Sequence, residues 1–244
     1  GGYCGAGHEL ADALLGAARK KEPEDLTAKK ELALEVIDRL KKEYPDAGCT
    51  LDYDHAWQLL VSVRLAAQCT DARVNIVVED LFARYPSVAA LAAAEPEDIE
   101  AIVKPCGLGH SKARDISACM RMLRDKYNCQ VPTTFEELLA LPGVGRKSAN
   151  LIMGDVFGKP AIVTDTHCIR LCNKIGLVDG IKEPQKVEMA LWKIIPPEEG
   201  SDLCHRFVMH GRAVCNARKP ECEKCCLNDI CRYAREQSGA DTAQ

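Results

Sequence analysis

The chain has few aromatic residues, no long apolar run and no excess of positive charge. Aromatic residues make up 5% of its 244 positions. No run approaches the roughly 18 apolar residues of a membrane-spanning helix, so we expect no membrane contact. The N-terminus shows no basic segment followed by an apolar one, so no secretory signal is predicted.

The formal net charge of −4 argues against a protein that binds every polyanion. Such proteins are usually strongly basic. The sum does not exclude one basic face and one acidic face on the same molecule. For any one basic cluster, a solvated helix face is an equally good interpretation.

Strand-like alternation is also nearly absent, and residues 161–164 are the only short candidate. Apolar residues instead recur at helical spacing in residues 57–69, 74–82 and 116–127. Proline and glycine fall between these segments. The pattern predicts an all-α protein whose helices, of about three turns, are joined by short loops.

The N-terminal part is less informative. We predict that residues 1–30 form a polar extension and that a helix covers residues 31–43, with one apolar face. Asp54 and Asp71 stand where N-caps of the following helices are expected.

Fourteen cysteines are many for this length, and nine of them are scattered singly. Scattered thiols at apolar helical positions behave as small hydrophobic residues in a reducing compartment. We therefore expect a cytoplasmic protein, in a bacterium at the nucleoid because no targeting segment is visible. A nuclear location stays open.

Four of the remaining cysteines follow the spacing C-x6-C-x2-C-x5-C, namely Cys215, Cys222, Cys225 and Cys231. Structural zinc and iron–sulfur clusters both take four thiolates. Zinc sites usually pair two short C-x2-C hooks, and only one is present, so the spacing favours an iron–sulfur cluster. Cys226 adjoins Cys225, and its role stays open.

Residues 141–150, LPGVGRKSAN, predict a glycine hairpin that leads directly into a helix. Its two glycines allow a tight turn and a close approach of the backbone to a partner. The helix start offers unpaired N–H groups and a positive dipole end, which suit a phosphate. Lys147 lies in the first turn, either as a nucleophile or only as a phosphate-binding or solvent-exposed lysine.

The hairpin and the cysteine loop are two of several motifs, and the order of these motifs along the chain is informative. The hairpin is followed by residues 163–170, VTDTHCIR, then by residues 210–212, HGR, and by the cysteine loop. Together with residues 65–71 and 107–113, they resemble the endonuclease III family of helix–hairpin–helix DNA glycosylases. The resemblance covers roughly residues 35 to 235.

The resemblance implies two helical lobes with a DNA-binding cleft between them. A six-helix domain would cover residues 50–162, with the helix–hairpin–helix at about 135–157. Residues 31–49 together with 163–235 would form the second domain, whose four cysteines hold a [4Fe-4S] cluster.

The resemblance further implies a base excision repair enzyme with two activities. It would remove oxidised pyrimidines from duplex DNA and then cleave 3′ to the abasic site by β-elimination. Lys147 takes the position of the amine nucleophile, and Asp165 that of the catalytic carboxylate. We expect Arg146, the helix dipole and partial burial to lower the pKa of Lys147. Asp165 also suits the N-cap of the next helix.

The resemblance also identifies residues that would contact DNA. Gln68 and Leu108 match residues that the family inserts into the duplex beside the extruded base. Backbone contacts to phosphate are expected from the hairpin, namely from Gly143, Val144, Gly145 and Arg146. The hairpin carbonyls are also a candidate site for a monovalent cation.

Three alternatives remain from the sequence. The first is the mismatch-adenine branch of the same fold, which usually lacks a lysine at position 147. The second is a damaged-DNA-binding protein without catalysis, for which the pair of Lys147 and Asp165 is not needed. The third is a zinc-stabilised scaffold. We expect a monomer whose partner is double-stranded DNA with an oxidised pyrimidine or an abasic site.

Overall fold

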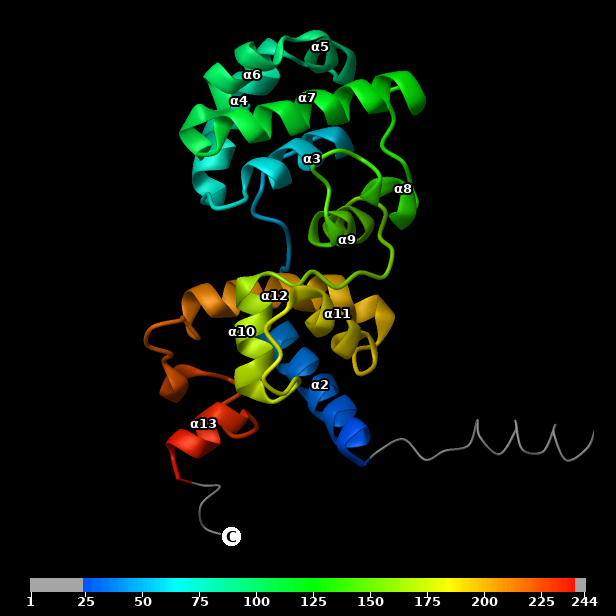
Figure 1. Ribbon diagram of the computed structural model, residues 1–244. Coiled ribbons are helices and arrows are strands. Elements are labelled where there is room, and N and C mark those ends of the chain that lie inside the picture. Colours follow the sequence, from blue (N-terminus) through cyan, green and yellow to red (C-terminus); the bar gives the residue numbers. More distant parts are fainter. Residues whose placement is uncertain (1–23, 240–244) are drawn as a thin grey trace, which may run out of the picture.

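The computed structural model describes residues 24–239, so most of the predicted N-terminal extension lies outside the described residues. The described chain is helical and contains no strand, which confirms the predicted all-α class (Figure 1). Its α-helices are α2 (Glu24–Glu43), α3 (Ala56–Leu65), α4 (Asp71–Arg84), α5 (Val88–Ala93), α6 (Pro96–Val103), α7 (Gly109–Lys126), α8 (Phe135–Leu139), α9 (Arg146–Asp155), α10 (Thr166–Ile175), α11 (Pro184–Trp192), α12 (Gly200–Ala213) and α13 (Arg232–Gln237). Short 3₁₀ turns are η1 (Lys104–Cys106), η2 (Pro197–Glu199) and η3 (Cys222–Lys224).

The helices form two lobes (Figure 1). The first lobe contains α3 to α9, and fully buried side chains such as Leu65, Leu81 and Met120 belong to its hydrophobic core. The second lobe contains α2 and α10 to α13, around a separate core that includes Leu40 and Phe207. A groove between two rigid lobes is a frequent place for a binding site.

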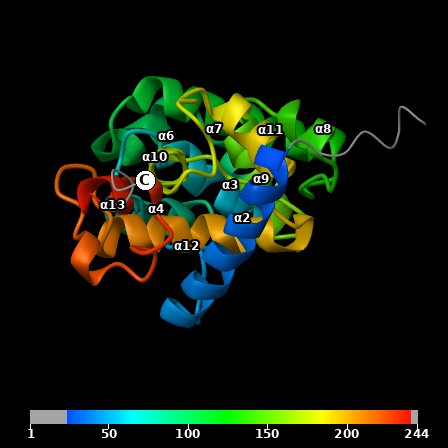
Figure 2. The same ribbon diagram turned by 90° about the horizontal axis from the view of Figure 1, so that it is seen from below.

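The chain crosses between the lobes after α2 and again after α9. Helix α2 therefore packs on α12, far from it in the sequence, as the view from below also shows (Figure 2). We retain residues 50–162, and residues 31–49 with 163–235, as proposed domain boundaries. No helix in residues 24–239 combines the length and the apolar character needed to cross a membrane.

The helix starts differ from three sequence predictions. Helix α2 begins at Glu24 rather than at residue 31. Thr70, not Asp71, is the N-cap of α4, and its side chain accepts a hydrogen bond from the Arg73 N–H. His55 rather than Asp54 precedes α3. Because a hydroxyl and a carboxylate can both cap a helix, the sequence alone does not separate Thr70 from Asp71.

The short strand candidate at residues 161–164 is not a strand. The segment has no regular secondary structure and no neighbouring strand in the described chain. Its N–H groups bind side chains instead: Ile162 donates to Asn150 Oδ1 at 3.4 Å and Val163 donates to Cys204 Sγ at 3.3 Å. The segment is thereby attached to α9 through Asn150 and to α12 through Cys204.

Candidate active site

The predicted helix–hairpin–helix is formed by α8, the turn at residues 140–145, and α9. The turn is closed by a hydrogen bond from the Val144 N–H to the Leu141 carbonyl at 3.2 Å. Gly143 has φ +76°, and a Cβ at this position would come within 2.8 Å of Asp115 Cβ, so both conformation and packing require glycine. Gly145 precedes α9, faces open space and provides no side-chain cap. The first amides of α9 are therefore open to an external acceptor.

Lys147 and Asp165 line the same cleft between the two lobes. Lys147 lies in the first turn of α9 and Asp165 directly before α10, so each lobe contributes one of them. The structure thus brings together the two residues that the sequence proposes for catalysis.

Asp165 is the N-cap of α10, as its alternative role predicted. Its Oδ1 accepts a hydrogen bond from the Cys168 N–H at 2.8 Å, and the side chain is half-buried. Capping uses one carboxylate oxygen and fixes the rotamer of the side chain. The cap and a catalytic role are therefore compatible.

Lys147 differs from expectation in its surroundings. Its side chain is exposed, so the predicted partial burial is wrong for the free protein. Its neighbour Arg146 points to α11, where Nε and Nη2 donate to both oxygens of Glu188 at 3.0 and 2.7 Å. The carboxylate of Glu188 neutralises this guanidinium. The charge of Arg146 is therefore directed to Glu188 and not to the Lys147 amine.

Gln68 and Leu108 share an unusual backbone conformation. Their φ angles are +55° and +48°, in the left-handed region that side chains other than glycine rarely adopt. Leu108 is 57% exposed although it is apolar, and Gln68 is also exposed. Strained exposed residues cluster at functional sites, where the surrounding structure holds them in place.

The cysteine loop surrounds a small cavity in the second lobe. Cys215, Cys222, Cys225 and Cys231 all line it, together with apolar residues. Burial raises the pKa of the Cys215 and Cys231 thiols, and that of Cys225 to about 12. Four thiolates at this position therefore require bound positive charge.

The four cysteines line one cavity, which is what ligands of one shared metal group would do. In residues 24–239, no three His, Cys, Asp or Glu side chains are grouped so as to hold one metal ion. Donors for cluster thiolates are also present: the Leu227 N–H lies 3.4 Å and His210 Nε2 3.2 Å from Cys225 Sγ.

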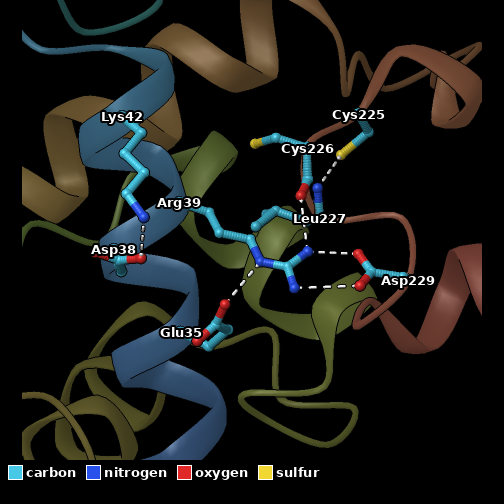
Figure 3. A network of polar contacts seen from close by, with 8 residues as sticks. All are labelled: Glu35, Asp38, Arg39, Lys42, Cys225, Cys226, Leu227 and Asp229. Atoms are coloured by element: carbon cyan, nitrogen blue, oxygen red, sulfur yellow. Dashed lines mark hydrogen bonds and ion pairs between the residues drawn. The ribbon is translucent and has the colours of Figure 1, made fainter.

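Cys226 lies next to Cys225 but does not line the cavity. In Figure 3 the two sulfur atoms point to different sides of the loop. The Cys226 carbonyl accepts a hydrogen bond from Arg39 Nη1 at 3.0 Å (Figure 3). The two terminal guanidinium nitrogens of Arg39, Nη1 and Nη2, also donate to the two carboxylate oxygens of Asp229. Helix α2 thus holds the cysteine loop from outside, and Cys226 belongs to this contact.

Helix α10 connects the cleft with the cysteine loop. Arg170 Nη2 donates to His167 Nδ1 and to the Cys215 carbonyl, both at 2.9 Å. Burial lowers the pKa of His167, which agrees with a neutral ring that accepts this bond. A Cβ at Gly211 would come within 2.6 Å of His167 Nδ1, so the glycine permits this packing.

Comparisons with known proteins agree with this geometry. Residues 61–197 match the HhH-GPD superfamily of base excision DNA repair proteins. Endonuclease III of Synechocystis sp. is 43% identical over 211 residues, which are 86% of this chain and 96% of that protein. Endonuclease III of Escherichia coli K12 is 38% identical over 82% of this chain and 94% of its own length. The chain belongs to the endonuclease III family.

Solved structures give the same result. A trapped covalent intermediate of endonuclease III with DNA and a non-covalent endonuclease III–DNA complex each superpose with a TM-score of 0.81. Both are 40% identical to this chain and cover 86% of it and 98% of their own length. A thermostable thymine-DNA glycosylase, at 21% identity and a TM-score of 0.75, shares the fold.

Sequence reasoning missed two members of the cleft in this endonuclease III family chain. Asp71 was assigned to helix capping, and Arg212 was named only as part of the HGR motif, yet both line the cleft with Lys147. Arg212 Nη2 lies 3.6 Å from Asp71 Oδ2, and Thr50 donates to the same carboxylate. Asp71 ends the motif at residues 65–71, which also contains Gln68, and this position could have placed it at the cleft.

Glu188 was also missed, because no local motif marks it. Its side chain is 3% exposed and accepts hydrogen bonds from Arg146, from Asn150 at 3.2 Å and from Trp192 at 3.1 Å. Arg146 directly precedes Lys147, so Glu188 fixes the start of α9 against the second lobe.

Glu188→Gln is therefore expected to destabilise the protein. It leaves the guanidinium of Arg146 without a counter-charge, which for a buried pair costs several kcal/mol. Because Arg146 is about one-third exposed, we expect roughly 2–3 kcal/mol in the free energy of unfolding, measured with urea. The matched control is Glu183→Gln on the exposed start of the same helix, expected to cost below ~0.5 kcal/mol. Equal losses in the two variants would contradict the assigned role.

Proposed function

We propose that this protein is a bifunctional DNA glycosylase and abasic-site lyase of base excision repair. It removes oxidised pyrimidines from duplex DNA and cleaves the strand 3′ to the resulting abasic site. The observation that carries this conclusion is the shared cleft of Lys147 and Asp165, with one residue from each lobe. Binding alone would not need an amine and a carboxylate at one position.

The cleft residues support a specific sequence of bond changes. The damaged nucleotide leaves the duplex and enters the cleft, where the Lys147 amine attacks C1′ of the deoxyribose. A C–N bond forms as the bond to the base breaks, and the base leaves with that electron pair and is protonated. Ring opening gives a Schiff base. Loss of a proton from C2′ then expels the 3′ phosphate.

Asp165 stabilises the positive charge that develops on the sugar as the base departs. Its carboxylate is held by the cap of α10, so it needs no rearrangement during the reaction. Lys147 is exposed in the free protein, so extruded DNA itself completes the burial of the amine. Catalysis is thereby restricted to a bound nucleotide.

The hairpin and the two strained segments bind the DNA. The open space at Gly145 and the uncapped start of α9 suit a phosphate that accepts from backbone N–H groups. Gly143 and Val144 shape the turn, and the backbone of Arg146 remains available although its side chain binds Glu188. Gln68 and Leu108 fill the space that the extruded base leaves.

The cysteine loop fits a [4Fe-4S] cluster held by Cys215, Cys222, Cys225 and Cys231. When bound, such a cluster supplies four thiolate bonds that order the loop. Arg39 and Arg170 attach this loop to α2 and α10. A monovalent cation at the hairpin carbonyls, a monomeric state and a bacterial cytoplasmic location remain predictions.

Asp165→Asn is expected to separate binding from chemistry. Asparagine caps a helix as well as aspartate does, so α10 keeps its start, while the negative charge is lost. Base removal should slow by about 10²-fold, with DNA affinity nearly unchanged. Single-turnover rates and titration with labelled DNA measure the two quantities. An unchanged rate of base removal would make Asp165 only a cap, because asparagine keeps the cap.

The proposed function is tested with a duplex oligonucleotide that contains one thymine glycol. We expect one break on the 3′ side of the lesion, leaving an unsaturated aldehyde end, and no break in the matched thymine duplex. Binding without a break would favour the non-catalytic alternative. Release of adenine from a mismatched duplex, with the thymine glycol left intact, would favour the mismatch-adenine branch.

A further inference from the structure

Lys112 on α7 is completely buried although its side chain ends in an ammonium group. Burying such a charge is costly unless it is paired or hydrogen-bonded. Its Nζ donates to three backbone carbonyls: Leu65 at 2.9 Å, Ala67 at 2.7 Å and Cys106 at 3.0 Å. A lysine ammonium has three donors, so all of them are satisfied within the protein.

The three carbonyls belong to the two segments that carry the proposed DNA-inserting residues. Leu65 ends α3, and Ala67 directly precedes Gln68. Cys106 ends η1, two residues before Leu108. Lys112 therefore joins two segments that are about forty residues apart in the sequence, and it does so beside each of the two exposed side chains.

Both segments need such a restraint. Gln68 and Leu108 adopt left-handed backbone conformations, which cost on the order of 1–2 kcal/mol each and persist only where the surroundings enforce them. The carbonyls at the ends of α3 and η1 also lack helical partners, and a cation at a helix C-terminus binds such carbonyls favourably. Charge-assisted hydrogen bonds are the stronger kind.

We propose that Lys112 is a positioning residue that holds the Gln68 and Leu108 segments at one fixed separation, so that both side chains enter the duplex together. The inference rests on the proposed function, because it concerns how the damaged base is extruded. Lys112 is 0% exposed and cannot touch DNA in this conformation. Its effect is exerted through the backbone of the two segments.

The test compares Lys112→Met with Lys126→Met, which removes the same charge from the exposed end of α7. Two substrates are used: a lesion duplex with 2-aminopurine beside the lesion, and a single-stranded oligonucleotide with an abasic site, which needs no extrusion. For Lys112→Met we expect kcat/KM on the duplex to fall by about 10- to 100-fold. The rise in 2-aminopurine fluorescence that reports unstacking should be lost as well.

Borohydride trapping on the single strand should stay within about twofold of the native protein, because the Lys147 chemistry is untouched. Lys126→Met should behave as native on both substrates. An equal loss on both substrates, or a normal unstacking signal in Lys112→Met, would overturn the inference. Absence of any adduct with the native protein would instead refute the proposed function, while the unstacking signal still decides about Lys112.

A second measurement applies if Lys112→Met does not fold. Gln68→Ala, Leu108→Ala and the double variant are compared on the lesion duplex with Lys112 intact. Residues held as one unit show non-additive effects, so the double variant should lose little more than the worse single one. Independent, additive losses in log kcat/KM would contradict the coupling through Lys112.

Discussion

Lys147→Ala should lose strand cleavage on the lesion duplex by at least about 10³-fold in kcat/KM, because no other amine replaces the covalent step. Lys147 lies at the exposed first turn of α9, where a truncated side chain leaves no cavity. We therefore expect a normal melting temperature and nearly normal affinity for the lesion duplex. Single-turnover cleavage and a binding titration on the same oligonucleotide measure the two effects.

Lys147→Arg is the informative companion variant. Arginine keeps the positive charge that a phosphate contact would use, but it is not deprotonated in proteins and cannot form the Schiff base. If Lys147 is the nucleophile, this variant should be as inactive as Lys147→Ala while binding DNA like the native protein. Substantial cleavage by Lys147→Arg would show that the residue acts only through its charge.

Cys225→Ser should release the proposed cluster and unfold the cysteine loop. The loop has few apolar residues, so most of its folding free energy comes from the bonds to the metal group. We expect loss of absorbance near 400 nm, loss of bound iron, and a decrease in stability of well over ~3 kcal/mol. Visible absorbance, elemental analysis and thermal unfolding of purified protein measure these changes.

Cys226→Ser is the matched control, because the two cysteines are adjacent and only Cys225 lines the cavity. We expect this variant to keep its iron and its colour, since the contact with Arg39 uses the Cys226 carbonyl. If Cys226→Ser were colourless and Cys225→Ser kept its colour, Cys226 and not Cys225 would be the fourth cluster ligand. Zinc in place of iron in the native protein would restore the zinc-scaffold alternative.

The sequence predicts those parts of the site that are local. The hairpin with Lys147, the cap at Asp165 and the cysteine spacing each lie within a short segment, where residue types and their order determine the geometry. The all-α class also follows from helical periodicity. Contacts between distant segments carry no such signal. Two such contacts depend on how the helices pack. Arg146 binds Glu188, and Lys112 binds backbone carbonyls beside Gln68 and Leu108.

Two errors have related causes. The expected burial of Lys147 assumed that neighbours in the sequence surround it, but Arg146 points to α11 and leaves the amine exposed. Asp71 was assigned to capping because it precedes an apolar helix, whereas Thr70 performs that role and Asp71 faces the cleft. In both cases the residue next to the predicted one makes the contact: Arg146 instead of Lys147 packs against the second lobe, and Thr70 instead of Asp71 caps the helix.

The central claim is that the Lys147 amine forms a covalent bond with the deoxyribose of an extruded nucleotide. Borohydride reduction during reaction with an abasic duplex, followed by proteolysis and mass spectrometry, locates that bond directly. The account predicts a single adduct on the peptide that contains Lys147, and none in Lys147→Ala. An adduct on another lysine, or none with the native protein, would contradict it.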